Sequence, residues 1–178
     1  MMAWQSRGLR GSALEELINL TNEKYREHGL ALIQKIPTPI KPIKLDQEKG
    51  HISLAYFEKR STVDYIGVVQ GIPICFEAKE TTKNELPLQN IHQHQLDFMS
   101  DFEKQEGIAF LIVFFALHNE YYYLPYCQLN EFFEQVKMGS KKSIPYEAFQ
   151  KQYKIETKSG YYLHYLEPLG AFLNDKGK

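Results

Sequence analysis

The sequence has few cysteines and no long apolar run. Cys75 and Cys127 are the two cysteines among 178 residues, and two cysteines form neither a disulfide framework nor a zinc-binding spacing. No apolar stretch approaches the roughly 20 residues that a membrane-spanning helix needs. The first residues also lack the apolar centre of a secretory signal. We therefore expect no membrane partner and a cytoplasmic location.

The sequence also lacks an excess of charge of one sign. Its formal net charge is −1, so the composition carries no general signature of nucleic-acid binding. Residues 1–60 nevertheless hold ten Lys and Arg against seven Asp and Glu. This asymmetry favours a phosphate-facing region, but ordinary variation of a solvated surface explains it nearly as well.

The remaining composition is that of a folded domain. Hydrophobic residues make up 43% and aromatic residues 13% of the chain, which argues against disorder. No internal repeat or low-complexity stretch is present. At this length one domain with a sizeable core is the simplest arrangement, and we expect a single domain over residues 1–178.

The middle of the chain predicts a β-hairpin. Two short apolar runs, residues 63–69 and 72–78, are separated by Gln70 and Gly71. Two β-rich runs joined by two residues ending in Gly are typical of a hairpin with a tight turn. Both runs are largely apolar, as expected of strands that are covered on both faces.

The register of this hairpin would bring four polar side chains together. Counting back from the turn places Asp64 opposite Glu77 and Thr62 opposite Lys79, on one face of the pair. Two opposed carboxylates repel each other, and a divalent cation bound by their oxygens removes that repulsion. The spacing therefore favours a metal site, although charges scattered along a solvent-facing edge are the more common fate of such residues.

A second polar group is expected beside this hairpin. Residues 89–105 have helical spacing, and Gln95 falls on the apolar side, one turn before Met99. A buried amide needs partners, because leaving it unsatisfied costs about 1–3 kcal/mol. His92 and His94 flank it, but no Cys or acid has a matching zinc-site spacing, so both are expected at the helix surface.

The rest of the chain predicts an α/β fold with a mixed central sheet flanked by helices. A long excursion at about residues 38–59 should form a hairpin with its tip near residues 46–50, and insertions of this length are often functional. The other expected elements are helices at about 12–28 and 129–136, and strands at about 30–33, 109–116 and 120–124.

Several motifs resemble those of a known family. Asp64, thirteen residues before Glu77-Ala78-Lys79, is similar to the PD-(D/E)xK nuclease arrangement, a short pattern with many chance matches. More specific motifs resemble the RecU-type Holliday junction resolvases over nearly the whole chain. They are F-E-A-K-E-T (76–81), L-P-L-Q-N-I-H-Q-H-Q (86–95), K-I-P-T-P (35–39), A-Y-F (55–57), K-K-S-I-P-Y (141–146), and an N-terminal R-G-L-R-G with L-E-E-L-I-N-L-T-N.

The resemblance implies a restriction-endonuclease-like core with a projecting stalk, formed here by the excursion at about 38–59. It implies a homodimeric, Mg²⁺-dependent endonuclease that cuts four-way DNA junctions by paired incisions in recombination and repair. Mn²⁺ is expected to substitute for Mg²⁺. The metal ligands would be Thr62, Asp64, Glu77 and Gln95, and Lys79 would stabilise the transition state.

DNA contacts are expected from basic residues outside this cluster. The candidates are Arg7 and Arg10 on the N-terminal arm and Lys41, Lys44 and Lys49 on the excursion. A frayed, solvated terminus is an equally good account of the two arginines. Recombination proteins are possible further partners.

Two other functions remain open. One is a nuclease of the same fold that acts on another DNA structure, such as a duplex site. The other is a DNA-binding or protein-recruiting module without catalysis. Asp64, Glu77 and Lys79 argue against the second, because such a module gains nothing from opposed acids on an apolar hairpin.

Overall fold

The computed structural model describes residues 13–37, 39–46, 48–57, 62–158 and 160–176. The elements in chain order are α1 (Ala13–Glu27), β1 (Ala31–Lys35), β2 (Ile40–Asp46), β3 (His51–Phe57), β4 (Tyr65–Val69), β5 (Ile72–Thr81), β6 (Glu85–Pro87), η1 (Leu88–Asn90), α2 (Gln93–Lys104), β7 (Ile108–Phe115), β8 (Glu120–Pro125), α3 (Tyr126–Lys137), β9 (Ser143–Pro145), η2 (Tyr146–Ala148), η3 (Lys151–Tyr153), β10 (Lys154–Ile155) and α4 (Leu166–Lys176). Among these residues, no helix combines the length and apolar character needed to cross a membrane.

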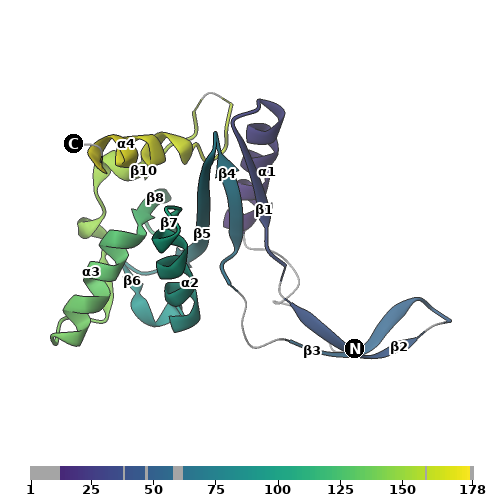
Figure 1. The fold of residues 1–178 in the computed structure, drawn as a ribbon. Helices are drawn as coiled ribbons and strands as arrows, with labels where there is room; N and C mark the ends of the chain where they lie inside the picture. Colours follow the sequence, from purple (N-terminus) through teal and green to yellow (C-terminus); the bar gives the residue numbers. More distant parts are fainter. Residues whose placement is uncertain (1–12, 38, 47, 58–61, 159, 177–178) are drawn as a thin grey trace.

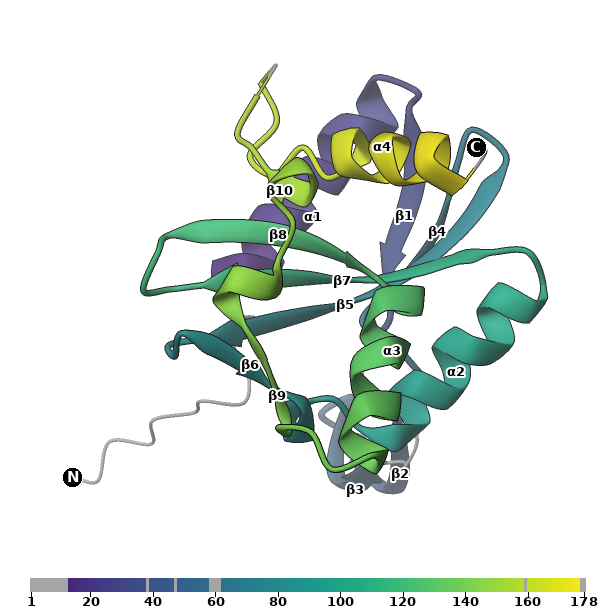
Figure 2. The same ribbon diagram turned by 90° about the vertical axis from the view of Figure 1, so that its left-hand side faces the viewer.

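A six-stranded mixed sheet forms the centre of the fold. Its strand order is β1-β4-β5-β7-β8-β10, in which β5 and β7 are parallel and every other neighbouring pair is antiparallel. Figure 2 shows α1 and α4 on one side of the sheet and α2 and α3 on the other. The predicted α/β class, with a mixed sheet flanked by helices, is confirmed.

Strands β5 and β7 are buried on both faces, so their side chains alternate between two apolar clusters. Phe76 and Phe110 point toward α1 and α4, where their rings stack with a centroid separation of 4.8 Å. Cys75 and Leu111 belong to the opposite cluster, under α2 and α3. Burial raises the pKa of the Cys75 thiol to about 12, so this residue is a buried apolar side chain, as its position in the hairpin predicts.

The predicted hairpin is β4–β5, and its register is the expected one. Val69 pairs with Ile72, and the turn residues Gln70 and Gly71 have φ angles of 48° and 92°. Positive φ at both central positions is the geometry of a type I′ turn, whose twist matches that of the flanking strands. Ladder pairing ends at Tyr65 opposite Phe76, so Asp64 is the first residue beyond it and Thr62 lies outside it.

The long excursion forms a separate two-stranded sheet, β2–β3, which we call the stalk. Figure 1 shows it projecting from the end of the main sheet where β1 and β4 meet the connecting chain. The apolar side chains of residues 40–56 that the structure describes are exposed; Leu45, for example, is 65% exposed. The predicted hairpin is confirmed, although residues 38, 47 and 58–61 lie outside the described part of the chain.

Two helices differ from expectation. The helix predicted at 89–105 begins at Gln93, because Leu88–Asn90 form a short 3-10 turn and Ile91 is extended. The helix predicted at 129–136 is longer and begins at Tyr126, directly after Pro125. Helical periodicity identifies both segments, but a local turn at the start of the first is invisible to it.

Beyond the helices, Glu120 joins three segments near the outer edge of the sheet. Its carboxylate accepts hydrogen bonds from Lys154 at 2.8 Å, from the hydroxyl of Tyr122 at 2.7 Å, and from the hydroxyl of Tyr146. These donors, Lys154 first, lower the pKa of Glu120 to about 2. The contact links β8 to β10 and to the 3-10 turn after β9.

Candidate active site

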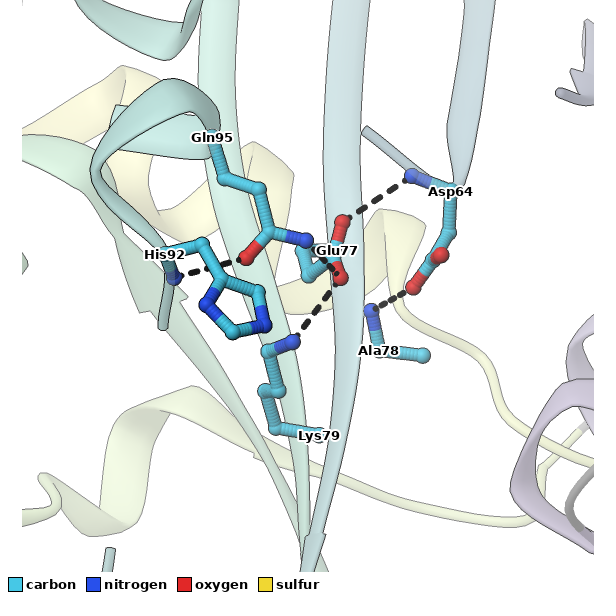
Figure 3. Close-up of polar contacts among 6 residues, drawn as sticks. All are labelled: Asp64, Glu77, Ala78, Lys79, His92 and Gln95. Atoms are coloured by element: carbon cyan, nitrogen blue, oxygen red, sulfur yellow. Dashed lines mark hydrogen bonds and ion pairs between the residues drawn. The ribbon is translucent and has the colours of Figure 1, made fainter. Parts of the chain in front are cut away.

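The two predicted acids meet where the β4–β5 ladder ends. The main-chain N–H of Asp64 donates to Oε2 of Glu77 at 3.0 Å, and the N–H of Ala78 donates to Oδ2 of Asp64 at 2.9 Å. Each acid is therefore bound to the other strand's main chain, which fixes the two carboxylates beside each other (Figure 3). The predicted opposition of Asp64 and Glu77 is present in the structure.

Glu77 is an unusual residue for the middle of a sheet, because it is an acid that is only 3% exposed. Burial, and after it the nearby charge of Asp64, raises the pKa of Glu77 from 4.5 to about 7, against the opposing effect of the Lys79 ammonium. An ionised carboxylate in this position is costly without compensating positive charge. The site is therefore suited to bind a cation.

Lys79 supplies part of that compensation from the same face of β5. Its Nζ lies 2.9 Å from Oε1 of Glu77, and its side chain is 15% exposed. A lysine and a glutamate two residues apart on a strand share a face because side chains alternate. Lys79 therefore contacts Glu77 and is still partly exposed to solvent.

Gln95 completes the contacts of Glu77 from α2. Its Nε2 donates to Oε1 of Glu77, and its Oε1 accepts from the main-chain N–H of His92 at 3.0 Å. Both ends of the buried amide are satisfied, as burial requires. The amide presents its NH₂ group to Glu77, so the expected ligand role of Gln95 requires the amide to rotate and bring its oxygen to that side.

Thr62 and the two histidines lie around this cluster. Thr62 is half-buried two residues before Asp64, and its hydroxyl has no hydrogen-bond partner among the described residues. The ladder does not extend to a Thr62–Lys79 pair. His92 is exposed, His94 is half-buried, and their rings stack with centroids 5.5 Å apart.

The donor set fits a hard divalent cation. Within the described residues no three His, Cys, Asp or Glu side chains meet at one point, so the cluster offers two carboxylates and neutral oxygens. Oxygen donors of this kind suit Mg²⁺, which is commonly bound through one or two carboxylates plus water and substrate phosphate. Such an ion would offset the negative charge of the buried Glu77 carboxylate and of Asp64 beside it.

The DNA-contact candidates are only partly placed. Lys41 and Lys44 lie on β2, and Lys49 lies in the turn at the tip of the stalk. All three are exposed. Arg7 and Arg10 lie outside the described residues.

Two main-chain groups take part in the site and were missed from the sequence. These are the N–H groups of Ala78 and His92, which fix Asp64 and Gln95 respectively. Every residue type except proline carries a main-chain N–H, so residue identity gives almost no signal for either contact. Only the paired register and the start of α2 reveal them.

Comparison with known proteins assigns the chain to a family. The sequence model of "Recombination protein U" (RecU) matches residues 9–171. Proteins named Holliday junction resolvase RecU are 40% identical in Pediococcus pentosaceus (94% of this chain, 86% of that protein), 46% in a Geobacillus species (78% and 71%) and 45% in Lactococcus lactis subsp. lactis (90% and 76%). The structure of the resolvase Hjc from Archaeoglobus fulgidus is 8% identical, with a TM-score of 0.47 over 78% of this chain and 91% of that one. Because the family model and these relatives cover most of its length, the chain belongs to the RecU family.

Proposed function

We propose that this protein is a single-domain endonuclease that resolves four-way (Holliday) DNA junctions by paired, Mg²⁺-dependent hydrolysis of phosphodiester bonds. The observation that carries the chemistry is Glu77, a nearly buried carboxylate beside Asp64 with Lys79 in contact. The substrate follows from the family, whose members are named Holliday junction resolvases.

Asp64 and Glu77 would hold the cation, with Thr62 and Gln95 as neutral ligands after rotation of the amide. A cation bound there supplies a Lewis acid for the phosphate and lowers the pKa of the attacking water. Mn²⁺, which accepts the same oxygen ligands, is expected to replace Mg²⁺.

The remaining steps belong to groups of the chain itself. Lys79 would stabilise the negative charge that develops on the phosphate oxygens, because its ammonium contacts Glu77 and its side chain is partly exposed to solvent. Preorganised donors of this type commonly contribute on the order of 10²–10³-fold in rate. Before a cation binds, Gln95 would hold the carboxylate of Glu77 in place through its Nε2 hydrogen bond.

The stalk supports a homodimer. Paired incisions need two active sites related by a twofold axis. A two-stranded hairpin alone is only marginally stable in water, and contiguous exposed apolar side chains mark interaction surfaces. Ile43, Leu45 and Leu54 are exposed on the stalk, which suits contact with a second copy, while Lys41, Lys44 and Lys49 suit the phosphates of the junction.

Cleavage of three DNAs of equal length tests this proposal: a four-way junction, a fork and a linear duplex, each with Mg²⁺ and with a chelator. We expect symmetric cuts in the junction that require Mg²⁺. Equal rates on all three would favour the same-fold nuclease with another substrate, and binding without any cutting would favour the non-catalytic module. Asp64→Ala should bind the junction and fail to cut it; turnover equal to that of the parent would refute the site.

A further inference from the structure

The motif K-K-S-I-P-Y (141–146) has no part in the site described above. It begins in the loop of residues 138–142 after α3, which we call the basic loop, and continues into β9. From its position and charge we propose that Lys141 and Lys142 bind the phosphate backbone of the DNA arm next to the cut, on the side of the active site opposite the stalk. This inference rests on the proposed nuclease function.

The first support is the way the basic loop is fixed in place. Strand β9 pairs with β6, with Ser143 opposite Pro87 and the fully buried Ile144 opposite the fully buried Leu86. The carbonyl of Lys142 accepts the N–H of Leu88 at 3.0 Å. The loop is therefore anchored by buried apolar side chains and not only by its own turn.

The second support is that this anchor belongs to the segment leading into the active site. The carbonyl of Leu88 accepts the N–H of Ile91 at 3.0 Å, and the next residue, His92, donates to Gln95, which contacts Glu77. Hydrogen bonds, together with the peptide link from Ile91 to His92, thus join the basic loop to the buried acid. The loop has a set position relative to the site.

The third support is the charge of the loop. Lys141 and Lys142 are both exposed, and neither has an ion-pair partner in the part of the chain that the structure describes. Of the nearby acids, Glu134 pairs with Lys137 at 2.6 Å, and Glu85 accepts from the hydroxyl of Ser143 at 2.9 Å without forming an ion pair with either lysine. Two adjacent exposed lysines that form no ion pair within the described residues are well suited to bind a polyanion such as the DNA backbone.

The last support is the arrangement of the whole molecule. Figure 1 shows the lower end of α3 and the stalk on opposite sides of the same edge, with the ends of β5 and α2 that carry the site between them; Figure 2 shows the chain returning from α3 to β9 at this edge. A strand whose phosphate reaches Glu77 continues in both directions. One direction leads to the stalk and the other to the basic loop.

The test is the salt dependence of junction binding without divalent metal, for the parent, K141A/K142A, K141R/K142R and the control K104A/K151A. The control also removes two exposed lysines, from the far end of α2 and from η3. Each lost phosphate contact lowers the slope of log K against log salt by about 0.9. For each bound protomer, we expect K141A/K142A to lose about 2 from the slope and roughly 10- to 60-fold in affinity near 0.1 M salt, so the proposed homodimer would lose about 4 from the slope. The loss should occur on every DNA sequence, while the arginine variant and the control keep the parent slope.

A K141A/K142A slope equal to that of the control would overturn the inference and leave the nuclease function untouched. Thermal melting of each variant shows whether the fold is intact. Cutting of prebound junction at saturating protein should be unchanged in K141A/K142A, since backbone contacts bind ground and transition states alike; a loss there would overturn a pure binding role. A parent that binds DNA but cuts no junction would refute the function, whatever the slopes.

Discussion

Replacement of Asp64 by Asn should remove cutting and stabilise the metal-free fold. The rise in the pKa of Glu77 from 4.5 to about 7 corresponds to about 3 kcal/mol of free energy against its ionised form. Burial is the larger cause and the charge of Asp64 the second, so the part that belongs to Asp64 is the smaller one, on the order of 1 kcal/mol. Asn is almost the same size and keeps an oxygen that can accept the N–H of Ala78. We therefore expect the free energy of unfolding to rise by about 1 kcal/mol, or about 2–4 °C in Tm.

The pH dependence of this gain identifies its cause. An acid whose pKa is raised on folding keeps its proton in the folded state over a pH range in which the unfolded chain has lost it. The free energy by which Glu77 destabilises the folded state therefore grows as pH rises from 4.5 to about 7. The gain of Asp64→Asn should be full above pH 7 and should fade as pH falls below 7, because Glu77 then becomes protonated in both folded proteins. Denaturant unfolding in EDTA at several pH values measures it, with Asp97→Asn as the exposed control. A gain that is independent of pH, or a loss of stability at pH 8, would refute the reasoning.

Three further results are expected. Gln95→Ala should lower the free energy of unfolding by about 2–4 kcal/mol, because one charge-assisted and one neutral buried hydrogen bond are lost. It should also slow junction cutting roughly 10- to 100-fold. The control Gln93→Ala, on the exposed side of α2, should change neither quantity. Glu120→Gln should lower the free energy of unfolding by about 1–2 kcal/mol at pH 7, an amount discounted for the partial exposure of Glu120. Because the pKa of Glu120 is lowered to about 2, the difference in stability between the two proteins should shrink as pH falls from 4.5 toward 2 in acid unfolding curves. Gly67→Ala should lower the melting temperature, because a Cβ there lies 2.4 Å from a main-chain oxygen of β1, whereas Gly170→Ala in α4 meets no atom within 4 Å and should raise stability by about 0.5–1 kcal/mol.

The hairpin could be predicted because its determinants are local. Gln70 and Gly71 set a two-residue turn, and with the turn in place every pairing back to Tyr65 is fixed by counting. The opposition of Asp64 and Glu77 then follows from the alternation of side chains along a strand. The mixed α/β class followed in the same way, from apolar runs whose length and periodicity are properties of short segments.

The placement of Gln95 could be predicted only in part, because it depends on tertiary contacts. Helical spacing put it on the apolar side of α2, and the structure buries it there. The orientation of its amide is set by the N–H of His92, which is available only because the helix begins at Gln93. The β6–β9 pairing is similar: two three-residue strands 55 residues apart give no periodic signal, and the pairing is stabilised by Leu86 and Ile144 after the fold has formed.

The sheet explains why Glu77 remains next to Asp64 despite the repulsion between them. Strand β5 pairs with β4 over residues 72–76 and with β7 over residues 74–81, so Glu77 lies in the β7 ladder directly after the end of the β4 ladder. The residue before Glu77, Phe76, stacks between Tyr65 and Phe110 on the opposite face, with centroid separations of 4.7 and 4.8 Å. Moving Glu77 away would require β5 to leave one ladder and break this stack, which costs more than the roughly 1 kcal/mol that the repulsion contributes. The main chain therefore keeps the acids in place, and only added positive charge lowers the free energy of the pair. Lys79 supplies one such charge, and a bound cation would supply the rest.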